Sequence, residues 1–334
     1  MALRVEAKII IITLVMILQT IDFLVMSRTL QDTLIVEKHQ QWVEKHGRVY
    51  KDNAEKEMRF KIFQDNIKYI ENSKIARNQS YQLSLNKFAD MTNEEFLAYY
   101  TGFNMPTRSA STTFKYDNLA DVPLSVNWVE KGAVTGVKNQ KHCGSCWAFS
   151  AVAAIESINQ IKSGKLVSLS EQQLIDCVSK NHGCSGGWMD YAFEYVKNNG
   201  ITTEENYEYT ESDNGVCNTK TPVVEIINYE DVPKNDEKAL QQAVANQPVS
   251  VGIDAYGSDF QFYSGGIFTG SCGNSLTHAV TIVGYGSENG MDYWLVKNSW
   301  GENWGDAGYM KIQRNAGVEG GLCGIAMAAS YPVA

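Results

Sequence analysis

The chain has 334 residues, of which 20% are charged and 44% belong to the hydrophobic set. This is the mix of an ordinary globular protein, and it excludes a chain that is disordered throughout. The formal net charge of -9 gives no reason to expect a nucleic-acid partner. The first 121 residues carry 16 basic and 15 acidic side chains, whereas residues 122–334 carry 13 and 23. This uneven charge predicts two segments with separate roles.

The N-terminus predicts export. Arg4 and Lys8 precede a short apolar run over residues 9–18, and Asp22 follows the run. The run is shorter than the roughly 20 residues that a membrane-spanning helix needs. We therefore interpret residues 1–27 as a signal peptide, with an uncleaved anchor as the alternative. The secretory pathway is the expected route, to a vacuole- or lysosome-like compartment or out of the cell, with no membrane association after cleavage.

All seven cysteines lie between Cys143 and Cys323. In an oxidising compartment most of them are expected to pair, and an odd number leaves at least one free or intermolecular. The part of the chain held by disulfides is therefore the C-terminal part.

Helical periodicity dominates the region before residue 122. Apolar residues recur at helical intervals over residues 30–76, among lysines and glutamates. A short helix is expected over Thr92–Tyr100, with Thr92 as N-cap and Glu95 three residues later. Residues 104–121 lack periodicity and indicate an exposed linker, the kind of segment that proteases cut. We expect residues 28–121 to form a pro-segment with its linker, and residues 122–334 to form the mature domain.

The mature domain is expected to be of the α+β class. Helices are predicted at residues 145–160, from Ser168 through a capping box with Glu171, and at residues 189–197. Strands are predicted later in the chain, at residues 223–229, 249–254, 278–285, 293–297 and 309–313. Helices followed by strands indicate two lobes, and a site between two lobes lies in a cleft.

Cys146 is the first candidate for catalytic chemistry. It stands at the start of a predicted helix, where the unpaired N–H groups and the helix dipole favour an anion. This position lowers the pKa of a thiol, and the thiolate is the nucleophilic form. Cys143 and Cys146 could instead be a redox dithiol, half of a zinc site, or two disulfide partners. The Gly-Ser spacer argues against a redox dithiol, and the scattered remaining cysteines argue against a zinc site. The odd number of cysteines argues against both being disulfide partners.

A thiol nucleophile needs a base and a group that orients the base. Of the five histidines, His278 begins an apolar strand that would hold its ring firmly. Asn298 is a candidate orienting group, and Trp300 could shield the polar pair from water. Taken singly, His278 could equally be a structural histidine and Asn298 a turn residue.

Together these segments resemble the papain family of cysteine proteases. Gln140-x-x-Cys143-Gly144-Ser145-Cys146-Trp147 is similar to the family's nucleophile segment. His278-Ala279-Val280 and Asn298-Ser299-Trp300-Gly301 are similar to its base and orienting segments, in the same order. The resemblance extends over essentially the whole chain and is closest to plant enzymes of the family. It implies a two-lobed fold, with a helical lobe, an antiparallel β-barrel-like lobe and a cleft between them, preceded by a helical propeptide.

The resemblance also implies the role of each residue. Cys146 is the thiolate that attacks the scissile carbonyl, and His278 is its imidazolium partner and proton donor to the leaving amine. Asn298 orients His278, and Gln140 supplies a side-chain donor to the oxyanion hole. Neither a metal nor a cofactor is expected. The implied disulfides are Cys143–Cys184, Cys177–Cys217 and Cys272–Cys323, which leave Cys146 free.

Substrate binding follows from the same resemblance. Glycine permits close backbone approach, and two glycines are expected to pair with the substrate backbone. The residues expected to contact substrate are Gly186, Gly187, Trp188, Met189, Gly252, Leu276, Thr277, Ala279, Trp300 and Ala328. The pocket residues among them are apolar or small and predict bulky hydrophobic residues at P2, two residues before the cleavage site. Two differences are notable: Thr277 replaces an Asp found in papain, and Gly252 widens the pocket.

The pro-segment resembles the family's inhibitory propeptide in two motifs. The helical motif and the second motif are carried by Glu55, Arg59, Phe63, Asn66, Ile70, Asn86, Phe88 and Asp90. Lys74 and Ser84 depart from the usual Asn and Gly. The resemblance implies a segment that crosses the cleft against the direction of substrate until acid weakens its carboxylate contacts. Asn78 is a candidate glycosylation site that would be lost on maturation.

The expected protein is a monomeric endopeptidase zymogen that acts on polypeptide substrates. Its own propeptide is the expected inhibitor, and the resemblance admits cystatin-type inhibitors as further partners. Three other functions remain open: a non-catalytic storage or binding protein, a pro-segment that inhibits other proteases, and a peptide ligase that uses the same acyl-enzyme. An intact nucleophile and base argue against the first of these.

Overall fold

The computed structural model describes residues 2–75, 80–106, 114–117, 119, 121–218 and 220–334. They form two compact units, residues 1–68 and residues 69–334. Among the described residues, no helix combines the length and the apolar character that crossing a membrane requires. The candidate glycosylation site Asn78 lies outside the described residues.

The first unit contains helix α1 (Ala2–His46) and most of helix α2 (Asn53–Ile75). The ring of Trp42 packs on that of Phe63, at a centroid distance of 5.3 Å. The single helix expected over residues 30–76 is wrong, because the chain leaves the helical conformation between the two. Gly47, with φ of +59°, takes up the left-handed conformation that commonly ends a helix.

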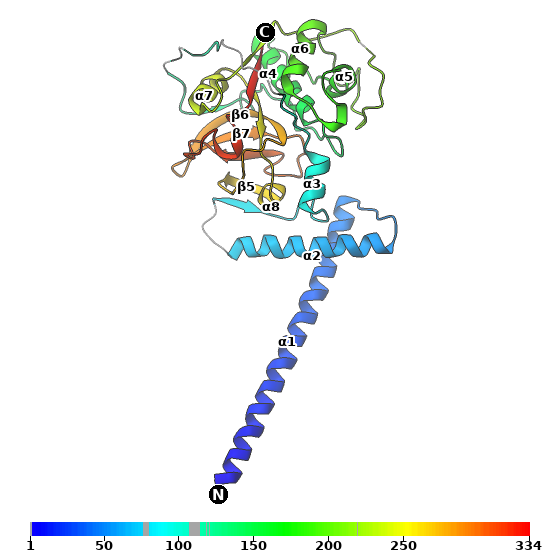
Figure 1. The fold of residues 1–334 in the computed structure, drawn as a ribbon, viewed down its shortest axis with the longest axis vertical. Coiled ribbons are helices and arrows are strands. Elements are labelled where there is room, and N and C mark those ends of the chain that lie inside the picture. Colours follow the sequence, from blue (N-terminus) through cyan, green and yellow to red (C-terminus); the bar gives the residue numbers. More distant parts are fainter. Residues whose placement is uncertain (1, 76–79, 107–113, 118, 120, 219) are drawn as a thin grey trace. The chain divides into compact units, whose positions relative to one another are not determined.

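Helices α4 (Cys146–Ser163), α5 (Glu171–Cys177) and α6 (Met189–Asn199) form one lobe of the second unit (Figure 1). The first thirteen residues of α4 are buried, so this helix is the core of the lobe. All three helices were expected, but the expected cap of α5 was wrong. Ser170, not Ser168, accepts the hydrogen bond from the N–H of Gln173. A short 3-10 turn, Gly183–Ser185, leads from α5 toward α6.

The other lobe is built on a nine-stranded sheet. Eight strands lie in the order β1-β5-β8-β7-β6-β4-β9-β3, and β2 pairs with β6. Neighbouring strands are antiparallel except for β5 and β8. The strands are β1 (Tyr81–Leu83), β2 (Val126–Asn127), β3 (Asn228–Asp231), β4 (Val249–Ile253), β5 (Tyr263–Phe268), β6 (His278–Glu288), β7 (Met291–Lys297), β8 (Tyr309–Gln313) and β9 (Ala329–Val333). The predicted α+β class with two lobes is confirmed.

The strand predictions were correct for β4, β6, β7 and β8, apart from their ends. The strand expected at residues 223–229 is wrong: that stretch forms one isolated bridge at Val224, and β3 begins only at Asn228. The sequence analysis missed α7 (Glu237–Asn246), α8 (Ser258–Phe262), η2 (Leu322–Gly324), β5 and β9. Of these, α7 carried a readable signal that was overlooked, an N-cap at Asp236 and an apolar face of Ala239, Leu240, Ala243 and Val244. The other four are short, and their neighbours in the fold rather than local periodicity specify them.

The second unit also contains pro-segment residues. Helix α3 (Asn93–Tyr100) begins at the expected capping box, in which Thr92 and Glu95 bond to each other's backbone. Upstream of α3, strand β1 extends the sheet by pairing with β5. The part of the pro-segment from Tyr69 onward is therefore in the same folded unit as the residues after 121.

Two serines join the lobes behind the site. Ser150 of α4 donates from Oγ to the carbonyl of Val280 in β6 (2.7 Å). Ser250 of β4 donates from Oγ to the carbonyl of Ser150 (2.9 Å). Because all three residues are buried, these bonds fix the start of β6 against the start of α4.

Candidate active site

Cys146 is the first residue of α4 and the only free cysteine in the described part of the chain. Its side chain is fully buried. Burial raises the pKa of the thiol to about 12, because an anion loses its hydration there. Backbone hydrogen bonds from Ala279, Trp147, Cys146 and Gly102 act in the opposite direction. In the precursor, Cys146 is therefore a neutral thiol despite its place at a helix N-terminus.

His278 begins β6 and is fully buried. Its Nε2 lies 2.8 Å from Oδ1 of Asn298, and its ring stacks on Trp300 at a centroid distance of 4.4 Å. Burial lowers the pKa of His278 to about 4, against the opposing hydrogen bond to Asn298. The neutral imidazole is therefore the form present in the precursor. Among the described residues, its Nδ1 is buried with no hydrogen-bond partner.

Cys146 and His278 belong to different lobes, and a backbone hydrogen bond brings their segments together. Ala279, the residue after His278, hydrogen-bonds to the sulfur of Cys146. No direct hydrogen bond joins the sulfur and the imidazole in the described structure. The structure thus brings together the three residues predicted as nucleophile, base and orienting group. Among the described residues, Nδ1 of the imidazole, the nitrogen not bound to Asn298, has no hydrogen-bond partner.

Gln140 is buried beside the nucleophile segment. Its Oε1 accepts a hydrogen bond from Oγ of Ser299 (2.6 Å), and its Nε2 donates to the carbonyl of Cys143 (2.9 Å). The same Nε2 lies 3.4 Å from the carbonyl oxygen of Tyr100 in the pro-segment. Trp300 donates from Nε1 to that oxygen (3.0 Å). Gln140 is therefore held with its amide directed at a carbonyl oxygen that lies in the cleft.

A buried ion cluster fixes the loop that carries Gln140. Nζ of Lys138 lies 3.1 Å from the carboxylate of Glu156 and 2.8 Å from that of Glu171. Burial raises the pKa of Glu171, and the charge of Lys138 opposes this shift. The loop is thus bonded to two helices of the first lobe, α4 and α5.

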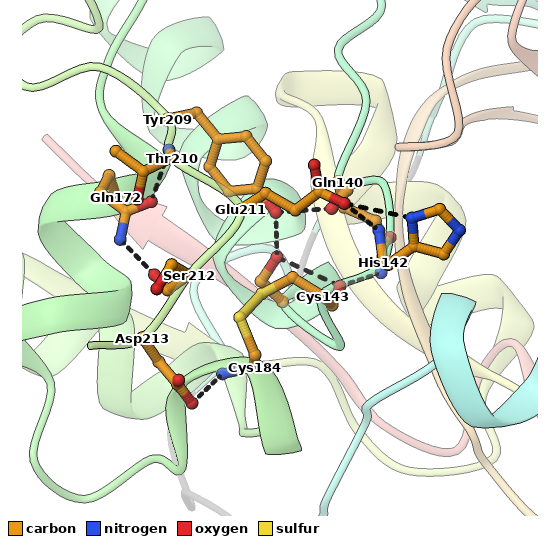
Figure 2. The surroundings of a disulfide bond; sticks show 12 residues. Gln140, His142, Cys143, Gln172, Cys184, Tyr209, Thr210, Glu211, Ser212 and Asp213 are labelled. Carbon is orange, nitrogen blue, oxygen red and sulfur yellow. Dashed lines mark hydrogen bonds and ion pairs between the residues drawn. A yellow bond between two sulfur atoms is a disulfide. The ribbon is translucent and has the colours of Figure 1, made fainter. Parts of the chain in front are cut away.

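The three disulfides are Cys143–Cys184, Cys177–Cys217 and Cys272–Cys323, the pairs that the family resemblance implied. Cys143–Cys184 links the nucleophile segment to the loop before Gly186 and Gly187 (Figure 2). The N–H of Gly144 also donates to the carbonyl of Cys184 (2.8 Å). The nucleophile and the two glycines therefore form one rigid wall of the cleft.

The pro-segment crosses this wall as extended backbone. Gly187 donates its N–H to the carbonyl of Gly102 (2.9 Å), and its own carbonyl accepts from the N–H of Asn104 (3.0 Å). On the other side, the carbonyl of Thr277 accepts from the N–H groups of Gly102 and Phe103 (3.0 and 2.9 Å). The bridge between Phe103 and Gly187 is parallel. The segment thus bonds to both walls of the cleft, directly above Cys146.

Gly102 is required by this close approach. A Cβ built at this position would lie 2.1 Å from the carbonyl oxygen of Gly144, far inside van der Waals contact. No side chain can therefore be accommodated where the pro-segment passes the nucleophile.

Phe103 fills an apolar pocket beside the nucleophile. Its ring is buried and packs on Trp188 at a centroid distance of 5.3 Å. A Cβ at Gly252 would lie 2.6 Å from Cζ of Phe103, so the missing side chain makes room for the ring. The other residues expected in the pocket, Met189, Leu276, Ala279 and Ala328, belong to the same core cluster as Phe103 and Trp188 or pack against it. Trp188 and Gly252 are thus the expected pocket residues that lie next to the ring of Phe103.

The remaining predicted contacts have other surroundings. Thr277 faces the cleft through its carbonyl, while its Oγ1 accepts a hydrogen bond from the N–H of Ala255 (3.2 Å). Trp300 covers His278 and is itself covered by Phe96 at a centroid distance of 5.0 Å. No group of three or more metal-ligating side chains occurs in the described part of the chain.

The sequence analysis missed the anchors of the pro-segment at α8. Tyr69 and Tyr81 donate their hydroxyls to the two carboxylate oxygens of Asp259 (2.7 and 2.6 Å). Asn86 donates from Nδ2 to the carbonyl of Gln261 (2.7 Å), and Nε2 of Gln261 donates to the carbonyl of Phe88 (3.2 Å). No periodic pattern marks such isolated polar residues. The asparagine and phenylalanine of the second pro-motif were the only signal available.

Two family models match the chain. The model described as papain family cysteine protease matches residues 122–333. The model described as cathepsin propeptide inhibitor domain matches residues 39–96.

Individual proteins are similar over most of the chain. The senescence-specific cysteine protease SAG12 of Arabidopsis thaliana is 52% identical over 322 residues, which cover 92% of this chain and 93% of that protein. The KDEL-tailed cysteine endopeptidase CEP2 of Arabidopsis thaliana is 54% identical over 302 residues, covering 86% and 83%. The solved structure of a recombinant stem bromelain precursor has a TM-score of 0.84 and 45% identity, covering 90% and 98%.

The chain therefore belongs to the papain family of cysteine proteases. It is a precursor, in which a propeptide inhibitor domain precedes the peptidase domain.

The buried thiol makes a prediction about the precursor. Because the sulfur of Cys146 is fully buried, a reagent reaches it only when the segment that covers it opens. We expect iodoacetamide to alkylate the intact precursor much more slowly than the same chain in denaturant at the same pH. Mass spectrometry of the peptide that contains Cys146 measures the rate, and Cys146→Ser gives the background. Equal rates in the folded and the denatured chain would contradict the prediction.

Gly102 provides a second test. Gly102→Ala should prevent the pro-segment from lying on the nucleophile, so the uncleaved precursor should react with a thiol-directed peptidyl epoxide at neutral pH. Gly136→Ala is the matched control, because a Cβ at Gly136 has nothing within 4 Å. Equal labelling of Gly102→Ala and the wild-type precursor would show that this contact does not close the site.

Proposed function

We propose that this precursor matures to a cysteine endopeptidase that works through a Cys146–His278 ion pair and a thioester acyl-enzyme. The observation that carries the proposal is the path of the pro-segment. Peptide backbone lies across Cys146, bonded to Gly187 and Thr277, with Phe103 in an apolar pocket. A cleft that binds one peptide backbone in this way offers the same hydrogen bonds to a substrate.

Removal of the pro-segment would return water to the pair. Without the desolvation that now raises the pKa of Cys146 and lowers that of His278, the proton can move from the sulfur to the imidazole. The start of α4 then favours the thiolate through the helix dipole, and Asn298 holds the imidazolium through Nε2. The proton-bearing Nδ1 is the nitrogen left free to face the sulfur and the substrate.

The reaction then follows in two steps. The thiolate of Cys146 attacks the scissile carbonyl, and the oxyanion accepts hydrogen bonds from Nε2 of Gln140 and the N–H of Cys146. His278 gives its proton to the leaving amine, and the C–N bond breaks to leave a thioester. His278 next takes a proton from water, which attacks the thioester and releases the acid with the thiolate restored. The contact between Gln140 and the carbonyl of Tyr100 supports this role, because the amide already points at a carbonyl oxygen.

The same geometry explains how the pro-segment resists cleavage. Its bridge to Gly187 is parallel, whereas we propose that a substrate pairs with Gly187 in the antiparallel direction. The anchors at Asp259 and Gln261 hold the segment in this reversed path. The proposed division is a signal peptide over residues 1–27, an inhibitory pro-segment over residues 28–121 and a mature enzyme over residues 122–334.

The proposed route is the secretory pathway, to a vacuole- or lysosome-like compartment or to the outside of the cell. Three disulfides are typical of proteins that fold in an oxidising compartment. The charged and apolar N-terminus, interpreted as a signal peptide, supports the same route. Glycosylation at Asn78 would then take place on the pro-segment.

Acid treatment of the precursor tests the function. We expect the wild-type chain to lose its pro-segment, cleave peptides and become labelled at Cys146 by a peptidyl epoxide. Cys146→Ser should remain full length, and His278→Ala should lose about a thousandfold in kcat/KM, within the range that general acid–base groups contribute. Glu194→Gln, which removes an exposed carboxylate from the same lobe, is the control. A wild-type chain that neither matures nor becomes labelled would refute the proposal.

Product analysis separates hydrolysis from peptide ligation. Both reactions share the thioester, and they differ in whether water or an amine takes the acyl group. With an added amino-acid amide as competitor, we expect free acid as the main product.

The pocket predicts specificity for bulky hydrophobic residues at P2. Because Phe103 occupies the space next to Gly252, we expect Phe and Leu to be accepted at P2. Gly252→Ala should lower the ratio of kcat/KM for Phe over Val at P2 about tenfold, the effect of overpacking by a methyl group. Gly265→Ala, where a Cβ meets nothing within 4 Å, should leave the ratio unchanged. A wild-type ratio in Gly252→Ala would mean that the side chain at P2 binds elsewhere.

A further inference from the structure

His142 stands beside the nucleophile segment, yet the mechanism does not use it. Its backbone N–H donates to Oε1 of Glu211 (2.9 Å), and its Nδ1 lies 3.2 Å from the same oxygen. The other carboxylate oxygen of Glu211 lies 3.4 Å from Nζ of Lys141. Figure 2 shows Glu211 directed at His142, next to the Cys143–Cys184 disulfide. In the neutral imidazole, an acceptor at Nδ1 favours the tautomer that carries its proton there, and Nε2 is then the acceptor.

The loop that carries Glu211 is itself held in place. The side chain of Gln172 accepts from the N–H of Thr210 (2.9 Å) and donates to the carbonyl of Ser212 (2.7 Å). Tyr209 donates its hydroxyl to the carbonyl of Gln140 (2.6 Å). Hydrogen bonds on both sides of Glu211 therefore fix the carboxylate, and through it the imidazole of His142 (Figure 2).

The free nitrogen of His142 meets a tyrosine of the pro-segment. Nε2 lies 3.1 Å from the hydroxyl of Tyr100, and the two ring centroids are 5.3 Å apart. Tyr99 contacts the same imidazole edge to face, at 5.8 Å. Within the pro-segment, the ring of Tyr100 packs on Phe88 at 4.5 Å. Tyr100 is almost completely buried, so its phenol is packed tightly in this position.

Chain order places this contact on one side of the scissile bond. Phe103 fills the P2 pocket, and Gly102 lies against the sulfur of Cys146. Tyr100 is the last residue of α3, and the chain becomes extended from Thr101 onward. Because Tyr100 precedes Gly102 and Phe103, it lies on the other side of the nucleophile, where the leaving amine of a substrate would be. Its carbonyl between Gln140 and Trp300 agrees with this position.

We propose that His142, oriented by Glu211, forms a subsite on the leaving-group side that selects tyrosine at one of the two residues after the cleavage site. The inference rests on the proposed endopeptidase function and adds a specificity that the P2 pocket does not supply. A substrate phenol would donate to Nε2 of the neutral imidazole from the place that the hydroxyl of Tyr100 occupies, with its ring against the imidazole face. Phenylalanine would keep the ring contact but lose the hydrogen bond.

Internally quenched peptides test the subsite. They share the residues before the cleavage site and carry Tyr, Phe or Ala at each of the next two positions, and mass spectrometry confirms the cleaved bond. At one of the two positions, we expect Tyr to exceed Phe in kcat/KM about fivefold, the effect of one neutral hydrogen bond. His142→Ala should bring the ratio to about one, and His142→Gln, which retains an acceptor, should restore part of it.

Glu211→Gln should lower the Tyr-to-Phe ratio by acting through His142, whereas Glu194→Gln should not change it. Titration of active enzyme with the peptidyl epoxide corrects each variant for its folded fraction. A ratio of one in the wild-type enzyme, or an unchanged ratio in His142→Ala, would overturn the subsite while leaving the endopeptidase intact. If the wild-type enzyme neither cleaves any peptide nor becomes labelled at Cys146, the endopeptidase itself is refuted, and the subsite with it.

Discussion

The close contact of backbone with backbone at Gly102 is the constraint on which the precursor depends. Gly144 lies on one side of Gly102 and Thr277 on the other, so the cleft at Cys146 has room for peptide backbone but not for a side chain. The same stretch of chain carries Phe103 into its pocket and Tyr100 onto His142, on opposite sides of the nucleophile. Cys146 and His278 are fully buried beneath it, and burial raises the pKa of the thiol and lowers that of the imidazole.

The fold supplies a rigid frame for that contact. One wall consists of the start of α4, tied by Cys143–Cys184 to the loop of Gly187. The other wall is the start of β6, which buried serine hydrogen bonds fix against α4. Each wall is therefore bound to the core of its own lobe by contacts that do not involve the pro-segment. The pro-segment adds strand β1 to the sheet edge and bonds to α8, both away from the reacting atoms.

Much of the site could be predicted from the sequence, because its chemistry lies in short contiguous motifs. Cys146 at a helix start and His278 at a strand start are local features that the fold retains. The break at Gly47 and the late start of β3 at Asn228 could not be read from apolar periodicity, which continues across both. Phe103 could not be predicted as a pocket ligand, since one aromatic residue in a loop carries no pattern. Its role depends on Gly252, a residue that lies far along the chain.

The buried pair at Cys146 and His278 has a consequence for the proposed activation by acid. While the pro-segment covers the pair, the proton lies on the sulfur of Cys146. In the proposed ion pair of the mature enzyme, the same proton lies on the imidazole of His278. The two states bind equal numbers of protons, so a change in pH over the range where both persist cannot favour one over the other through this pair. The catalytic centre is thus not the pH sensor of its own activation. Any dependence of release on pH must then come from groups that hold the pro-segment from outside the cleft.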